Sequence, residues 1–145
     1  MNNQDNFSIK IKKQLISRSV YDENKARLHR SNLSAGLYCA TKLLNYPRDL
    51  YLCVLLDNKH QFICDSIINS DLSITLEKLC STISFLATDG DSREVILAVR
   101  PKDLTDFEYI SAKAVVIDDM LKDYGIDLYG YFITDGIDFE NIIPK

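Results

Sequence analysis

Histidine is scarce in this chain, because its 145 residues include only His29 and His60, which lie far apart in the sequence. A metal or acid–base site made of imidazoles would therefore have to be assembled across the fold. Glycine and proline are also few, with 5 and 3 residues, whereas 46% of the residues are apolar. This composition excludes collagen-like, low-complexity and disordered chains. We expect one globular domain, residues 1–145, with a core of its own.

Long apolar runs and paired cysteines are missing as well. The longest apolar runs, such as 52–56, are far shorter than the roughly 18–20 residues that cross a bilayer. Residues 1–10 lack the regions of a secretory signal. The cysteines Cys39, Cys53, Cys64 and Cys80 show no CxxC spacing, and each lies in an apolar pattern. We therefore expect a cytoplasmic protein without a leader or a membrane partner, whose cysteines are reduced core residues.

Charge is unevenly distributed along the chain, whose formal net charge is −4. Residues 10–30 carry seven basic and two acidic side chains, whereas residues 31–145 are strongly acidic. We interpret residues 1–30 as a basic N-terminal arm on an acidic body. Its candidates for binding a phosphate backbone or an acidic partner are Lys10, Lys12, Lys13, Arg27 and Arg30. The alternative is a solvated face, or one that packs against the acidic body.

Hydrophobic periodicity predicts strands and helices in the order β-α-β-β-α-β-α-β. The ranges are an edge strand at 7–12, a helix at 32–45 before Pro47, hairpin strands at 50–56 and 61–67, a helix at 74–88, a strand at 94–99, a helix at 105–124 and a strand at 126–133. Residues 134–136 turn the chain into a short tail. Hairpins mixed with helical crossovers favour an α/β (α+β) fold in which helices flank a mixed sheet.

The hairpin has a predicted register. A two-residue turn at 58–59 places Leu55 opposite Phe62 and Cys53 opposite Cys64. The facing cysteines are interpreted as buried thiols, with a cross-strand disulfide or redox switch as the alternative. The first of the two strands is apolar on both faces, so we expect it inside the sheet.

Three further local patterns give expectations. Thr105-x-x-Glu108 is the signature of a capping box at the start of the last helix. Alternation in the last strand places Tyr129 and Tyr131 on one face, either in the core or at an interface. His60 lies in the hairpin loop and is interpreted as a turn residue.

The segment 47–63 resembles a known family opening. It reads PRDLYLCVLLDNKHQFI and is similar to the R-E-x-F-x-V-L-x-L-D-x-x-N-x-L-I of RadC-like proteins, which are bacterial members of the JAB/MPN domain family. The spacing from Asp57 to 96–98 resembles the family's spacing to its I-L-A-H-N-H-P strand, and 125–136 resembles its I-x-L-x-D-H-x-I-V-G-D-G end. Residues 21–37 resemble the lead-in helix region. The resemblance covers nearly the whole chain and implies the JAB/MPN (cytidine-deaminase-like) architecture.

The chain departs from this family at the catalytic motif. A working JAB site holds zinc with His-x-His and an Asp about ten residues on, while an upstream Glu acts as general base on the zinc-bound water. The resemblance places Val99 at the first His, with no second His after it. The ligand Asp falls near Tyr109, and the base corresponds to Asp49. Because valine cannot coordinate a metal, the resemblance implies an inactive member, a pseudoenzyme without zinc or another cofactor.

Charged residues around those positions are candidates for a vestigial cleft. They are Asp49, Arg100, Lys102, Asp103, Asp106 and Glu108. Such a cleft would take a peptide terminus, a phosphate or Mg²⁺, and the alternative is a solvated loop with a helix cap.

The sequence as a whole favours a protein-interaction or regulatory module, with a homodimer as one option because MPN domains commonly pair. Two alternatives stay open. One is a nucleic-acid-associated accessory protein of DNA repair or mobile-element biology, which would use the basic arm. The other is an acidic inhibitor of a nucleic-acid enzyme.

Overall fold

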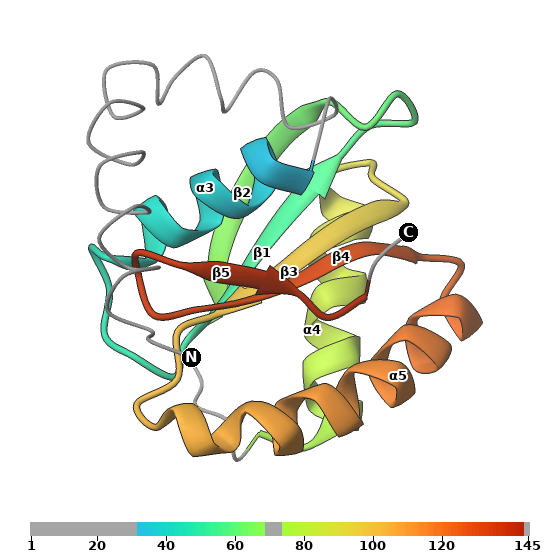
Figure 1. Cartoon of the computed structure of the whole chain (residues 1–145). Coiled ribbons are helices and arrows are strands. Elements are labelled where there is room, and N and C mark those ends of the chain that lie inside the picture. Colours follow the sequence, from blue (N-terminus) through green and yellow to red (C-terminus); the bar gives the residue numbers. More distant parts are fainter. Residues whose placement is uncertain (1–31, 69–73, 144–145) are drawn as a thin grey trace.

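A computed structural model describes residues 32–68 and 74–143 (Figure 1). Its elements are α3 (Asn32–Leu43), β1 (Tyr51–Leu56), β2 (Phe62–Ile68), α4 (Leu76–Asp89), β3 (Glu94–Val99), the short 3-10 turn η2 (Leu104–Asp106), α5 (Phe107–Asp123), β4 (Asp127–Thr134) and β5 (Phe139–Asn141). The strands form one mixed sheet in the order β2-β1-β3-β4-β5. The expected mixed sheet flanked by helices is therefore confirmed, while the predicted strand at 7–12 and the basic arm lie outside the described residues.

Strand β1 lies inside the sheet, as its sequence predicts. All six of its residues are buried, and it pairs in antiparallel fashion with both β2 and β3. Strands β3 and β4 are parallel and are joined through α5, whereas β4 and β5 are antiparallel. The sheet is mixed because a hairpin and a helical crossover both contribute strands to it.

Each face of the sheet carries its own apolar cluster. One face packs against α4 and α5, whose inward side chains recur at helical spacing: Leu79, Cys80, Ile83, Ile110, Ala114, Ile117 and Leu121. The other face packs against α3, with Ala35, Tyr38, Cys39 and Leu43 in the cluster. Figure 1 shows α3 separated by the sheet from α4 and α5. Within the described ranges, no helix is both long enough and apolar enough to cross a membrane.

The hairpin register differs from the predicted one by two residues. Cys53 pairs with Ser66, and Leu55 pairs with Cys64, so the two cysteines are not opposite each other. All four cysteines are free thiols, but Cys64 is exposed. The expectation that every cysteine lies in the core is therefore wrong for Cys64, because β2 is an edge strand that is only partly covered.

The register changes because the turn is longer than two residues. The Asp57 carboxylate accepts hydrogen bonds from the backbone N–H groups of Lys59 and Gln61, at 2.8 and 2.9 Å. His60 adopts a left-handed conformation with φ of 62°, and the pairing shifts between Leu55 and Leu56. An Asx turn followed by a left-handed residue is a common way to build a longer hairpin loop.

A β-bulge in β4 breaks the expected alternation. Leu128 pairs with Val95, but the next pair in the ladder joins Gly130 to Ile96, so Tyr129 is an extra residue. Tyr131 consequently faces the α4 and α5 side, whereas Tyr129 packs on the α3 side. The prediction that the two tyrosines share a face is wrong, because an inserted residue reverses the alternation.

The start of α5 and the segment after residue 136 also differ from expectation. The side chain of Asp106, at the N-cap of α5, makes no capping hydrogen bond, and Asp103 accepts the N–H of Thr105 at 2.9 Å. The local cap therefore forms two residues before the predicted capping box, at the 3-10 turn. The expected tail after residue 136 instead forms β5, because the turn at 134–138 directs the chain back alongside β4.

Candidate functional site

The predicted base position and the predicted ligand strand meet at one end of the sheet. Asp49 precedes β1 and Arg100 follows β3, and these strands are antiparallel neighbours. The Asp49 N–H donates to the carbonyl oxygen of Arg100 at 2.9 Å. The Asp49 carboxylate accepts the backbone N–H of Lys102, also at 2.9 Å. Asp49 has a φ of 70°, a left-handed conformation that aspartate tolerates through such local bonds.

Two guanidinium groups form hydrogen bonds between the loop before β1 and the loop after β3. Arg48 donates to the carbonyl oxygen of Pro101 at 3.3 Å, and Arg100 donates to the carbonyl oxygen of Tyr46 at 2.8 Å. Burial lowers the pKa of Arg100, the charge of Arg48 lowers it further, and Asp135 raises it.

Val99 lies in the core. It is the last residue of β3, where it pairs with Tyr51 of β1 and Ile133 of β4, and it is completely buried in the cluster under α4 and α5. The position at which the family resemblance would put a zinc-binding imidazole therefore lies in an apolar environment.

The other predicted site residues follow in the loop and in the first turns of α5. Asp103 is exposed, and the backbone and side chain of Thr105 lower the pKa of its carboxyl by hydrogen bonding. Asp106 is partly buried and Glu108 is exposed. Tyr109 points outward, with the Lys113 ammonium 4.8 Å from its ring centroid, a cation–π distance.

The structure thus brings together Asp49, Arg100 and Lys102, while Tyr109 faces solvent on α5. The predicted basic residues Lys10, Lys12, Lys13, Arg27 and Arg30 lie outside the described ranges. Within residues 32–68 and 74–143, no three His, Cys, Asp or Glu side chains are grouped so that they could hold a metal ion.

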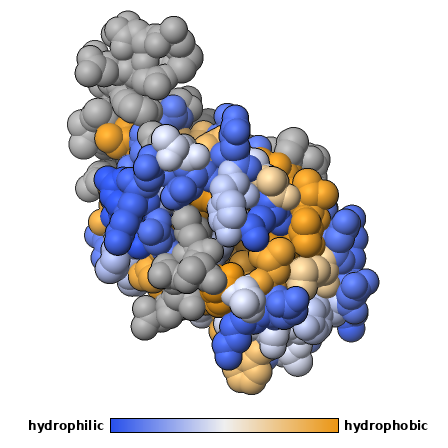
Figure 2. Space-filling model, turned by 90° about the horizontal axis from the view of Figure 1, so that it is seen from below, coloured by the Kyte–Doolittle hydropathy of each residue, from blue (hydrophilic) through white to orange (hydrophobic). Residues whose placement is uncertain are grey.

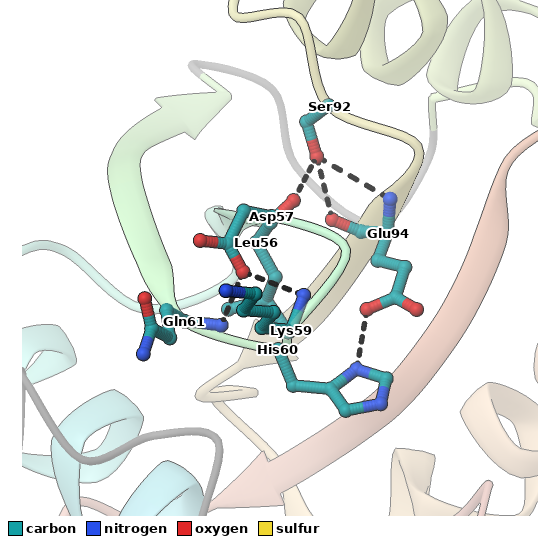
Figure 3. Close-up of polar contacts among 7 residues, drawn as sticks. All are labelled: Leu56, Asp57, Lys59, His60, Gln61, Ser92 and Glu94. Atoms are coloured by element: carbon teal, nitrogen blue, oxygen red, sulfur yellow. Dashed lines mark hydrogen bonds and ion pairs between the residues drawn. The ribbon is translucent and has the colours of Figure 1, made fainter.

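A second polar cluster, which the sequence did not predict, lies at the opposite end of β1 and β3 (Figure 3). His60 Nδ1 is 2.5 Å from a carboxylate oxygen of Glu94. The imidazole also stacks on Tyr129, with 4.4 Å between ring centroids and 19° between planes. His60 is therefore more than a turn residue, since its ring connects the hairpin to β3 and β4.

Ser92 connects Leu56 and Glu94 within this cluster (Figure 3). Its hydroxyl lies 2.6 Å from the carbonyl oxygen of Leu56 and 2.8 Å from that of Glu94, and it is buried. Beside it is a cavity of about 370 Å³ lined by Leu56, Asp57, Asn58, Asp91, Arg93 and Glu94. When Nδ1 carries the hydrogen, it donates a hydrogen bond to the Glu94 carboxylate, and Nε2 is then the acceptor nitrogen of the ring. Because the Ser92 hydroxyl is hydrogen-bonded to backbone carbonyl oxygens, it is not available as a nucleophile for the pair.

The chain was compared with known proteins. A scan against protein-family models finds no match, and a search of curated proteins also finds none.

Proposed function

We propose that this chain is a catalytically inactive RadC-like JAB/MPN domain that acts by binding another protein in the cytoplasm. The proposal rests on the sequence resemblance and is carried by one observation, the burial of Val99 at the position of the first zinc ligand. A buried valine offers no lone pair to a metal ion, and a histidine there would have to displace core side chains.

The placement of Asp49 supports the family resemblance. A general base has to lie beside the strand that carries the metal ligands, because it acts on the metal-bound water. Asp49 and Arg100 are 51 positions apart in sequence but share a backbone hydrogen bond. This juxtaposition of the two positions supports the proposal of a JAB-like domain that lacks the side chains for zinc chemistry.

Asp49 also supports the loss of activity. Its carboxylate accepts the N–H of Lys102 and so holds the loop that follows β3. A carboxylate engaged with backbone in this way serves the conformation of a loop, and its one-methylene side chain reaches less far than that of glutamate.

The binding role is supported by the outward face of α5. Val115 is 59% exposed, Val116 44% and Tyr109 50%. Figure 2, which views the molecule from the side where α5 lies, shows apolar side chains gathered beside charged ones. Exposed apolar residues of this kind, with a charged rim, are typical of surfaces that contact other proteins.

Elemental analysis of the purified full chain tests the loss of chemistry. We expect zinc far below one ion per chain and no isopeptidase or nuclease activity. Stoichiometric zinc, together with an activity that a chelator abolishes, would contradict the proposal.

A salt titration with duplex DNA separates the nucleic-acid alternative from protein binding. Affinity that falls steeply with salt, and is lost when Lys10, Lys12, Lys13, Arg27 and Arg30 are all neutralised, would favour the accessory-protein role. We expect no such binding at moderate salt.

A further inference from the structure

We infer that Arg48, Arg100 and Lys102 form a binding site for an oxyanion, a carboxylate or phosphate group. The inference deepens the proposed function, on which it rests for the assumption that a partner presents this group. The three residues come from two loops, one before β1 and one after β3. Because Arg48 donates to the carbonyl oxygen of Pro101, its guanidinium lies beside the peptide segment that connects the other two cations.

Carboxylates of the same loops accept hydrogen bonds from backbone N–H groups. Each of three aspartate carboxylates accepts hydrogen bonds from N–H groups of its own turn or the neighbouring one: Asp49 from Lys102, Asp103 from Thr105, and Asp135 from Ile137 and Asp138. The ion pairs seen among the described residues join other side chains, namely Lys42 to Asp65, His60 to Glu94 and Lys122 to Asp118. Within the described ranges, Arg48, Arg100 and Lys102 form no ion pair with a carboxylate, and Asp135 is the acidic residue that raises the pKa of Arg100.

Arg100 has unused hydrogen-bonding capacity in a partly buried setting. Its Nε atom is buried and has no hydrogen-bond partner within the described chain, while one terminal nitrogen donates to Tyr46. A buried donor without a partner costs free energy, and two neighbouring guanidinium groups repel each other. An oxyanion between them would relieve the repulsion and use the fork-shaped geometry that suits arginine to carboxylate and phosphate.

The location also suits a ligand. Arg100 follows β3 and Asp135 follows β4, and these two strands are parallel. Ligands of α/β proteins commonly bind outside the carboxyl ends of parallel strands, where the loops converge.

The test is an NMR titration of the ¹⁵N-labelled full chain with sodium phosphate and, separately, sodium acetate, at fixed ionic strength. We expect saturable shifts of the backbone amides of Arg100 and Lys102. Arg48→Gln should weaken the affinity about tenfold, the effect of one charge-assisted hydrogen bond of about 1.4 kcal/mol. Lys59→Gln, which removes an exposed cation in the distant hairpin turn, is the matched control and should leave the affinity unchanged.

A second variant separates charge from geometry. Arg100→Lys keeps the positive charge but lacks the guanidinium fork, so we expect a loss of affinity with the fold intact by unfolding measurements. Tighter binding of phosphate than acetate would identify a phosphoryl group as the natural ligand, and the reverse a carboxylate. Shifts that never saturate, or an equal loss in Arg48→Gln and Lys59→Gln, would overturn the inference. That failure would leave the zinc result untouched, because elemental analysis measures zinc independently of the anion titration.

Discussion

His60 and Glu94 meet with 2.5 Å between Nδ1 and a carboxylate oxygen, although they are 34 positions apart in the sequence. His60 reaches this position because its left-handed backbone turns the ring over the end of the sheet. Glu94 begins β3, opposite Leu56 at the end of β1, and the imidazole continues onto Tyr129 of β4. One side chain of the hairpin turn therefore contacts two strands beyond the hairpin itself.

His60→Asn should lower the free energy of unfolding by about 1–2 kcal/mol, the sum expected for a lost partly buried hydrogen bond and a lost ring contact. Asparagine is chosen because it tolerates the left-handed conformation, so that backbone strain does not contribute. Urea unfolding measures the difference.

Glu94→Gln provides the comparison for this pair, since glutamine keeps an acceptor oxygen and should cost less than His60→Asn. The double variant should be less destabilised than the two single losses added together, because the side chains interact. Lys59→Ala, in the same turn, should stay within about 0.5 kcal/mol of the wild type. Additive losses would show that the pair does not contribute to stability as a unit.

Gly36→Ala should destabilise the protein, although the same change usually stabilises a helix by roughly 0.5–1 kcal/mol. Gly36 lies in α3, and a Cβ there would come within 2.2 Å of the Phe139 ring. We expect a loss of about 1–3 kcal/mol from overpacking, measured by urea unfolding. Combining Gly36→Ala with Phe139→Ala should cost less than the two changes added together. A more stable single variant would mean that β5 does not pack on α3.

Features set by local pattern were predicted well from the sequence. The strand at 94–99 follows from a continuous apolar run, and the helix α4 follows from uninterrupted helical spacing of apolar residues. Prediction from the sequence failed where a single residue changes the strand register or the face to which side chains point. The Asx turn of Asp57 moved the hairpin register, and the bulge at Tyr129 reversed a face. Strand β5 has only three residues, which is too short for a periodic signal, so its pairing with β4 was missed.

The two polar clusters also differ in how far the sequence predicted them. The family resemblance made Asp49 and Arg100 candidates for one cleft, and the two residues do lie together. The contact of His60 with Glu94 and Tyr129 depends jointly on the turn conformation, the hairpin register and the bulge. None of these has a spacing that marks it in the sequence, and so His60 was interpreted only as a turn residue.

Thiol reagents should distinguish Cys64 from the other cysteines. Burial raises the pKa of Cys53 to about 12 and that of Cys80 to about 11, and it raises the pKa of Cys39 further still. Cys64 is exposed. Because the thiolate is the reactive form, Ellman's reagent at mildly alkaline pH should modify Cys64 rapidly and the other three only on unfolding. Cys64→Ser should abolish the rapid phase, whereas a second rapidly modified thiol in the native protein would contradict the described burial.

The carboxyl of Asp103 should titrate below its ordinary value of 3.8, because the N–H and hydroxyl of Thr105 stabilise the charged form. A depressed folded-state pKa contributes stability that is present above the ordinary value and is lost as pH falls through the folded-state pKa. Carboxyl ¹³C NMR over acidic pH measures this titration. Thr105→Ala removes the hydroxyl but keeps the backbone N–H, which is the larger cause, so the pKa should rise only part of the way. A complete return to the ordinary value in Thr105→Ala would show that the backbone hydrogen bond, and with it the start of the 3-10 turn, is absent in solution.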